Sequence, residues 1–300
     1  MKKIRIIGAG SVGSFLAARL KTSGVDVELI SHSMSSKSAV TIRAESEVSV
    51  PIGPYSGLSG ADQIWVTTKA AALPLVLSQI AKVSELRNVP LVFFQNGIGV
   101  LEGTERLLSS DWLRAVCWFG VRKEVLGPTD FRVHVAGVDS VEWGGPGASR
   151  FGREFSDALK IAGVPGVHLE DADQVEWRKA LWNISSNALC AVAQAPNGHA
   201  EADPELRPLA ELLYAEAAAV AKARGVKLAP DVHDRCFAGM KKTATNLNSM
   251  LMDLRGGKKT ELPWLNQKVV DWGAQVGVPT PSNAWICGFI RYFESKGPRA

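Results

Sequence analysis

An apolar run followed at once by a glycine-rich loop opens the chain, and this pair of features restricts the fold most. Lys3–Ile7 is typical of a buried strand, and Gly8-Ala9-Gly10-Ser11-Val12-Gly13 joins it to a helical pattern over Ser14–Ser23. A GxGxxG loop in this strand–helix context predicts a dinucleotide-binding unit, with an ordinary glycine-rich turn as the alternative. The first glycine allows a tight turn, the second lets a pyrophosphate approach the backbone, and the third permits close helix–strand packing. The helix N-terminus would supply N–H groups and positive potential for the phosphates.

The first half of the chain continues this alternation of short apolar runs and helical patterns. Further strands are expected at Val27–Ser31, Gln63–Thr67 and Val89–Phe94, and helices at Leu73–Ser84 and Gly103–Ser109. Strands separated by helices predict a parallel sheet that is covered on both faces.

Three later segments are rich in strand-forming residues and contain no long helical pattern. They are Leu113–Lys123, Arg132–Val138 and Ser140–Trp143. We expect them to add strands to one edge of the sheet.

From about Asp173 the pattern becomes helical almost throughout. Apolar periodicity predicts one long helix over Val175–Ala193, which Pro196-Asn197-Gly198 stops. Further helices, separated by glycine and proline, are expected at Arg207–Arg224, Asp231–Met240, Ala244–Leu254, Pro263–Val276 and Ser282–Ser295. We therefore predict an α/β dinucleotide-binding domain over residues 1–168 and an all-helical domain over residues 169–300.

Composition argues against several other classes of protein. The net charge of +4 over 300 residues is mild and the basic residues are spread along the chain, so no nucleic-acid partner is expected. The cysteines show no CxxC or nearby histidine spacing, which favours buried free thiols over a metal site. No run approaches the ~20 apolar residues that span a membrane, and the run after Lys2-Lys3 is too short for a signal peptide. We expect a cytoplasmic protein without membrane contact.

The end of the second predicted strand indicates the cofactor preference. NAD enzymes usually place Asp or Glu there for the ribose 2′-hydroxyl, whereas this chain reads Ile30-Ser31-His32-Ser33. With no carboxylate to repel it, a 2′-phosphate could accept hydrogen bonds from Ser31, His32, Ser33 and Lys37, although no arginine is present. NADPH is therefore favoured over NADH. The alternative is that His32 is an exposed loop residue without a role.

Several further segments form an ordered set along the chain. They are Val66-Thr67-Thr68-Lys69, Gln95-Asn96-Gly97-Ile98-Gly99, Trp177-Arg178-Lys179 with Asn183 and Asn187, Pro196-Asn197-Gly198, Ser249-Met250-Leu251-Met252-Asp253 and Thr260-Glu261-Leu262. With the glycine loop, this set covers nearly the whole chain and resembles the ketopantoate reductase (2-dehydropantoate 2-reductase) family. The resemblance implies a Rossmann-type domain followed by a helical domain like the C-terminal domain of 6-phosphogluconate dehydrogenase.

The resemblance also implies a reaction, and roles for the matching residues. NADPH would pass a hydride to the ketone carbon of 2-dehydropantoate, giving pantoate on the route to pantothenate. Lys179 resembles the family's catalytic lysine, with Glu261 as a carboxylate that orients it. The residues expected to hold the substrate are Asn96, Asn183, Asn187, Asn197 and Ser249. Those expected near the cofactor are the glycine loop, His32, Lys69, Asn96, Val121 and Glu261.

The long helix of the second half has the side chains that this chemistry needs. Hydride attack creates an oxyanion, which a cation stabilises and an N–H donor protonates, and Lys179 can do both. Lys179, Asn183 and Asn187 share one helix face because they are spaced four residues apart. Polar side chains inside an apolar helix need partners, which a bound substrate would provide. A polar network between helices, or a solvated face, is the alternative interpretation.

Two departures from the family pattern bear on cofactor and substrate. Position 32 is His where family members often have a cofactor-binding arginine, and Leu262-Pro263-Trp264 follows Glu261 where an Ile-Asp-Tyr type of segment is common. A reductase of another small 2-keto acid, or an opine-type dehydrogenase, is therefore the alternative enzyme. A non-catalytic NADPH-binding sensor is the alternative from another class, although it would have no reason to keep the lysine and asparagines together. The sequence leaves a homodimer open.

Overall fold

The computed structural model describes residues 2–104, 107–108 and 111–297, and the chain divides into two compact units. One unit consists of Met1–Gln95 and Leu101–Val175, and the other of Asn96–Val100 and Glu176–Ala300. The predicted helix Gly103–Ser109 includes residues that lie outside the described part of the chain.

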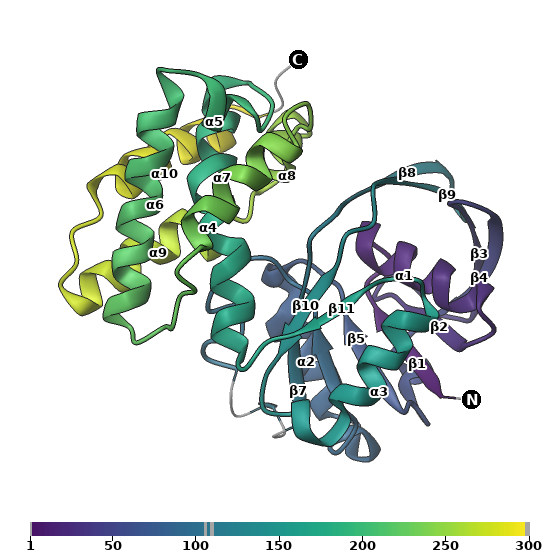
Figure 1. The fold of residues 1–300 in the computed structure, drawn as a ribbon. Coiled ribbons are helices and arrows are strands. Elements are labelled where there is room, and N and C mark those ends of the chain that lie inside the picture. Colours follow the sequence, from purple (N-terminus) through teal and green to yellow (C-terminus); the bar gives the residue numbers. More distant parts are fainter. Residues whose placement is uncertain (1, 105–106, 109–110, 298–300) are drawn as a thin grey trace. The chain divides into compact units, whose positions relative to one another are not determined.

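A mixed β-sheet is the framework of the first unit (Figure 1). Its strands are β1 (Lys3–Ile7), β2 (Asp26–Ile30), β3 (Ser38–Arg43), β4 (Glu47–Gly53), β5 (Gln63–Val66), β6 (Leu91–Phe93), β7 (Trp112–Cys117), β8 (Gly120–Gly127), β9 (Asp130–Ala136), β10 (Val141–Gly144) and β11 (Gly166–His168). Their order across the sheet is β11-β10-β7-β6-β5-β1-β2-β4-β3-β9-β8. All neighbours from β7 to β4 run parallel, which confirms the predicted parallel core.

Helices pack on this sheet, and aromatic side chains fill the core beneath two of them. The helical segments are α1 (Ser11–Thr22), α2 (Leu73–Ala81), α3 (Ala148–Ile161) and the short turns η1 (Tyr55–Leu58), η2 (Ala70–Ala72) and η3 (Ser84–Leu86). Phe15 of α1 and Phe155 of α3 belong to one hydrophobic cluster with Trp65 and Trp143 of the sheet. The Phe155 ring meets Trp65 and Trp143 edge-on, at centroid distances of 5.3 and 5.7 Å. Such aromatic pairs contribute about 0.5–1.5 kcal/mol each beyond the burial of area, so they help to fix α3 on the sheet.

The prediction that the later strands all extend one edge of the sheet was wrong. β7, β10 and β11 lie towards one edge, whereas β8 and β9 form an antiparallel hairpin at the other edge, beside β3. The hairpin lies at that edge because β9 pairs in parallel with β3. This pairing joins segments far apart in the sequence, so local periodicity does not predict it. The sequence prediction also missed β3, β4, β11 and α3. For α3 a signal was present, since Phe151, Phe155 and Leu159 recur every four residues.

The second unit is helical, as predicted. Its helices are α4 (Ala172–Ala193, whose first residues belong to the other unit), α5 (His199–Ala202), α6 (Leu206–Ala223), α7 (Val232–Lys242), α8 (Ser249–Arg255), η5 (Leu262–Trp264), α9 (Asn266–Val276) and α10 (Pro281–Ser295). Helix α8 begins later than predicted because Asn248 caps it, accepting a hydrogen bond at Oδ1 from Leu251 N at 2.9 Å. The predicted helix Pro263–Val276 divides into η5 and α9.

Helix α4 contributes a large part of the core of this unit, and the buried Asn266 anchors its backbone. Ile184 and Leu189 of α4 pack in one cluster with residues of α6, α9 and α10. Asn266 Nδ2 donates to Ile184 O and to Asn283 Oδ1, both at 3.0 Å. Asn283 Nδ2 donates in turn to Glu216 Oε2 at 2.8 Å. This network holds the middle of α4 against three neighbouring helices.

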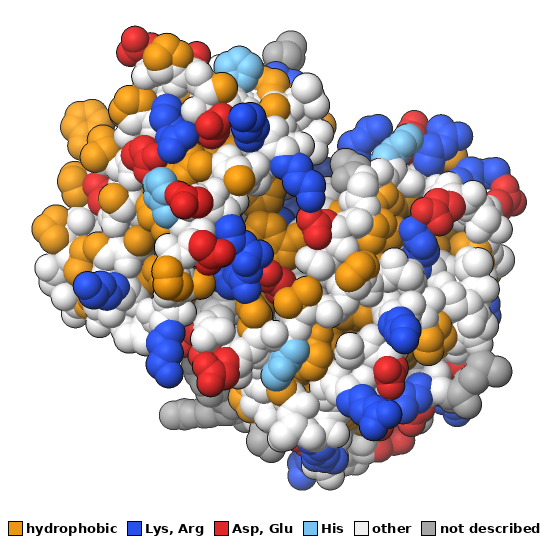
Figure 2. All heavy atoms as spheres, viewed as in Figure 1, with side chains coloured by type: hydrophobic (Ala, Val, Ile, Leu, Met, Phe, Trp, Pro, Cys, Tyr) orange, Lys and Arg blue, Asp and Glu red, His pale blue; other side chains and the backbone are white. Residues whose placement is uncertain are grey.

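Other features of the surface and interior bear on the predicted class. The cysteines Cys117, Cys190, Cys236 and Cys287 are buried and free, as predicted. Among the residues that the structure describes, no helix has the length and apolarity to cross a bilayer, and no three His, Cys, Asp or Glu side chains gather as metal ligands would. Acidic and basic side chains are interspersed over the face of the molecule in Figure 2.

Candidate active site

The glycine loop joins β1 directly to α1, which begins at Ser11, earlier than predicted. Gly8 has a φ of +114°, a conformation that favours glycine. A Cβ on Gly13 would lie 2.0 Å from Gly8 O, so any larger residue would push the helix away from the loop. Thr67 Oγ1, just after β5, donates to Gly8 O at 2.9 Å and helps to hold the loop in place.

The loop has room for the phosphates of a dinucleotide. A Cβ on Gly10 would meet no atom within 4 Å, so the backbone at this position is open to a ligand. The first turn of α1 contains no acidic residue, and no side chain caps the helix. N–H groups at a helix N-terminus attract anions by hydrogen bonding and through the helix dipole. These residues therefore fit a pyrophosphate.

The polar residues after β2 have different surroundings. Ser31 Oγ and Ser33 Oγ lie 2.9 Å apart, and both residues line a pocket. His32 is exposed and is not among the residues that line this pocket. Lys37 Nζ lies 3.5 Å from Glu28 Oε2, so its charge faces a carboxylate. Ser31 and Ser33 are therefore the residues predicted to bind a 2′-phosphate that line this pocket, whereas His32 and Lys37 are not among its lining residues.

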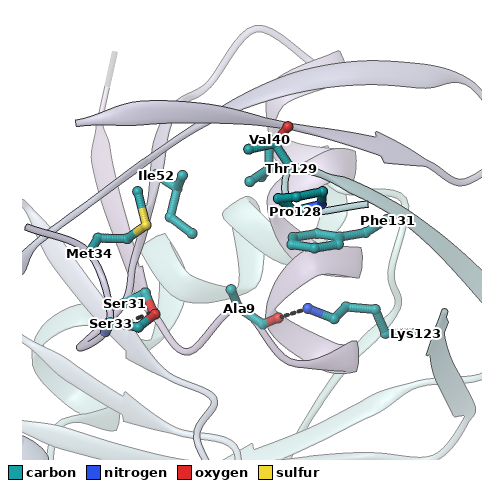
Figure 3. A pocket seen from close by; sticks show the side chains of 10 residues that line it. All are labelled: Ala9, Ser31, Ser33, Met34, Val40, Ile52, Lys123, Pro128, Thr129 and Phe131. Carbon is teal, nitrogen blue, oxygen red and sulfur yellow. Dashed lines mark hydrogen bonds between the residues drawn. The ribbon is translucent and has the colours of Figure 1, made fainter. Parts of the chain in front are cut away.

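This pocket, about 310 Å³ in volume, extends from the glycine loop to the β8–β9 hairpin (Figure 3). It is lined by Ala9, Ser31, Ser33, Met34, Val40, Ile52, Lys123, Pro128, Thr129 and Phe131. Lys123 N donates to Ser11 Oγ at 3.1 Å, and Lys123 Nζ donates to Ala9 O at 2.7 Å. Val121, predicted near the cofactor, is half-buried on the same strand. Sequence reasoning missed Lys123, because these partners lie 112 and 114 residues away in the chain and no local pattern marks it.

Lys69, the remaining predicted cofactor residue of the first unit, is exposed shortly after the C-terminal end of β5. Ligands of open parallel sheets bind at this end of the strands. Beside it, Thr68 Oγ1 is buried and has no hydrogen-bond partner within the described residues. The segment therefore presents both a cation and an unsatisfied hydroxyl.

The predicted polar face of α4 is buried. Lys179, Asn183 and Asn187 are 8%, 6% and 6% exposed. Lys179 Nζ lies 4.6 Å from the centroid of the Trp182 ring, within the range of a cation–π interaction. The Asn183 side chain forms no hydrogen bond with any other described residue. Because buried amides are rarely left unpaired, this face is suited to a ligand or to ordered water.

Two further residues predicted to hold the substrate, Asn197 and Ser249, differ in exposure. Asn197 is buried, and its Nδ2 donates to Thr243 Oγ1 at 3.4 Å. Its Oδ1 is buried without a partner among the described residues. Ser249 is exposed at the start of α8, where the neighbouring Asn248 is the capping residue.

Asn96 and Glu261, both predicted near the cofactor, lie together. Asn96 Nδ2 donates to Glu261 Oε2 at 3.4 Å. The following Gly97 has a φ of +99°, and a Cβ there would lie 2.6 Å from Trp264 O. Glycine at position 97 thus allows the two segments to pack against each other.

The same segment is also bonded to α4. Gly99 N donates to Glu176 Oε2 at 2.7 Å, one helical turn before Lys179. The predicted substrate and catalytic residues therefore lie in the second unit, and the glycine loop, His32, Lys69 and Val121 lie in the first. The interaction of Glu261 with Lys179 stays a prediction.

Most of the sequence is similar to proteins of one known family. Two family models match the chain: "Ketopantoate reductase PanE/ApbA" over residues 4–147 and "Ketopantoate reductase PanE/ApbA C terminal" over residues 171–294. A 2-dehydropantoate 2-reductase of Vibrio cholerae is 29% identical over 304 residues, which cover 99% of this chain and 99% of that protein.

Solved structures show the same fold. A PanE/ApbA family ketopantoate reductase from Ralstonia eutropha JMP134 matches with a TM-score of 0.84 and 24% identity, covering 98% of this chain and 99% of that one. A D-mandelate dehydrogenase solved with NADH and anilino(oxo)acetate matches with a TM-score of 0.84 and 22% identity, over the same shares of the two chains. The two family matches cover most of both units, and the chain therefore belongs to the ketopantoate reductase family of oxidoreductases.

Proposed function

We propose that the chain catalyses the NADPH-dependent reduction of 2-dehydropantoate to pantoate, a step of pantothenate biosynthesis. Membership of the family supports the reaction class. Within the structure, the proposal is carried by the polar face of α4, where Lys179 and Asn183 are buried and the Asn183 amide has no hydrogen-bond partner among the described residues. A small polar keto acid would supply the hydrogen bonds that Asn183 does not make within the chain.

Lys179 has the chemistry that ketone reduction needs. NADPH, when bound, would supply the hydride for the ketone carbon, and negative charge would then develop on the ketone oxygen. An ammonium group beside that oxygen stabilises the charge and donates a proton, which completes the hydroxyl and leaves a neutral amine that water reprotonates. Helix α4 packs into the core through the neighbouring Ala180 and Leu181, so the backbone that carries Lys179 is held in place before the reaction begins.

The surrounding polar side chains would position the substrate and the lysine. Asn183, Asn187, Asn197 and Ser249 offer amide and hydroxyl donors for the substrate carboxylate and hydroxyl groups. Glu261 would orient Lys179, and the hydrogen bond from Asn96 supports Glu261 in that role.

We assign the cofactor to the glycine loop. Further contacts with the cofactor are proposed for His32, Lys69, Asn96, Val121 and Glu261. The preference for NADPH over NADH is supported by the pocket beside the loop, whose lining residues include no Asp or Glu. A carboxylate at this place would select the 2′-hydroxyl of NADH.

The test is the loss of NADPH absorbance with purified protein and a panel of 2-keto acids, with NADH in parallel. Fast oxidation that is selective for ketopantoate and NADPH is expected. NADPH binding without oxidation across the whole panel would contradict the proposal and favour a non-catalytic sensor.

A bulkier 2-keto acid is the second candidate substrate. It is favoured by Trp182, whose ring lies 4.6 Å from Lys179 Nζ and is only partly buried, so an aromatic or branched group could pack beside the reacting ketone. Turnover of such a keto acid with little turnover of ketopantoate would keep the mechanism and change the substrate. A homodimer and a cytoplasmic location stay predictions from the sequence.

A further inference from the structure

Lys123 is a half-buried cation that forms no ion pair with any carboxylate of the described residues. Its Nζ donates to Ala9 O at 2.7 Å and lies 3.7 Å from the centroid of the Phe131 ring. The adjacent Glu124 pairs instead with His134 at 3.0 Å and with Arg132 at 3.6 Å. The partners of the Lys123 ammonium are therefore a carbonyl and an aromatic ring, both without net charge.

This environment disfavours an isolated positive charge. Burial lowers the pKa of Lys123 below its ordinary value. A hydrogen bond from an ammonium to a phosphate oxygen is stronger than one to a neutral carbonyl. A phosphate in the pocket would therefore compensate the charge better than Ala9 O does.

The pocket that Lys123 lines reaches the place where dinucleotide cofactors differ. Ser31 and Ser33 follow β2, the strand whose end lies beside the ribose 2′ position in dinucleotide-binding folds. Figure 3 shows the two serines on one side of the pocket and Lys123 on the other, with Ala9 of the glycine loop between them. Lysine, serine hydroxyls and the absence of carboxylates among the lining residues suit a phosphate better than a ribose hydroxyl.

We propose that Lys123 binds the 2′-phosphate of NADP(H) together with Ser31 and Ser33, and so selects NADP(H) over NAD(H). This inference rests on the proposed assignment of the cofactor to the glycine loop. The loop after β2 contains no arginine. Lys123 of the β8–β9 hairpin would then determine the preference for NADP(H) over NAD(H). The flexible lysine stem allows the ammonium to leave Ala9 O and reach into the pocket.

The experiment is a calorimetric titration of the full chain with four ligands: NADPH, NADH, adenosine 2′,5′-bisphosphate and AMP. For Lys123→Met, the Kd for NADPH and for the bisphosphate should rise roughly ten- to a hundredfold, the value of one charged hydrogen bond. The Kd for NADH and for AMP should stay as in the wild type. Lys123→Arg should retain most of the preference, because it keeps the cation.

Arg122→Gln is the matched control, since it removes the same charge from an adjacent, exposed position that does not line the pocket. It should leave the ratio of the two cofactor affinities unchanged. An equal weakening of NADPH and NADH in Lys123→Met would overturn the inference, since Lys123 would then bind the pyrophosphate or only support the loop. An unchanged ratio would overturn it as well. A wild-type chain that binds NADPH but reduces no keto acid would contradict the proposed reaction and leave this inference standing.

Discussion

Replacing Asn183 by leucine tests whether the polar face of α4 serves a ligand or the fold. Asn183 is 6% exposed, its side chain forms no hydrogen bond with another described residue, and it precedes the core residue Ile184. Leucine is similar in size and has no polar group to desolvate. A buried polar group without a partner costs about 1–3 kcal/mol. Because the remaining exposure leaves the amide partly hydrated, we expect the free energy of unfolding to rise by about 1 kcal/mol.

Asn266→Leu is the matched control, because the same change at this site removes hydrogen bonds that the fold uses. Asn266 is fully buried and donates to Ile184 O and to Asn283 Oδ1. Both acceptors would lose that donor inside the core. At about 1–3 kcal/mol for each of the two unsatisfied acceptors, we expect a loss of about 2–6 kcal/mol in the free energy of unfolding.

Both variants would be compared with the wild type by urea unfolding, followed by far-UV circular dichroism, and by steady-state kinetics. Asn183→Leu should unfold at a higher urea concentration and lose roughly ten- to a hundredfold in kcat/KM, the effect of one hydrogen bond to a charged substrate group. Asn266→Leu should unfold at a lower concentration. The reasoning is refuted if Asn183→Leu destabilises the chain as much as Asn266→Leu does, or if it keeps full activity.

Two further predictions follow from the loop and from the surface of the second unit. Gly10→Ala should leave the melting temperature unchanged and weaken NADPH binding, since its Cβ meets no protein atom within 4 Å. Gly13→Ala should lower both the melting temperature and the affinity for NADPH, since its Cβ would lie 2.0 Å from a carbonyl oxygen. Unchanged NADPH affinity in Gly10→Ala would count against the cofactor site. The hydrogen bond to Glu211 raises the pKa of His233 above its ordinary value of 6.5, so this pairing stabilises the fold fully below that pH and is lost as the pH rises through the folded-state pKa. His233→Gln should therefore lower the melting temperature more at pH 5.5 than at pH 9, and equal effects at the two pH values would contradict this assignment.

The features predicted correctly from the sequence are those encoded within a few residues. The glycine loop is defined by a short motif between a strand and a helix, and its backbone follows from the glycines themselves. Lys179, Asn183 and Asn187 lie on one buried face because residues four apart in a helix must do so. Patterns of this kind need no knowledge of the rest of the fold.

The features that were missed depend on contacts between distant segments. The place of the β8–β9 hairpin is decided by pairing between β9 and β3, and this pairing brings Lys123 to the glycine loop. Local sequence specifies that β8 and β9 form strands but not which edge they join. The start of α8 was missed for a local reason: the helix was expected from Ala244, but Asn248 caps it and α8 begins at Ser249.

The most direct test of the proposed reaction is the turnover of Lys179→Met with saturating NADPH and ketopantoate, measured beside its affinity for NADPH. If Lys179 is the proton donor, kcat should fall by roughly 10²–10⁴-fold while the Kd for NADPH stays near that of the wild type. Turnover close to that of the wild type would contradict the central role of Lys179.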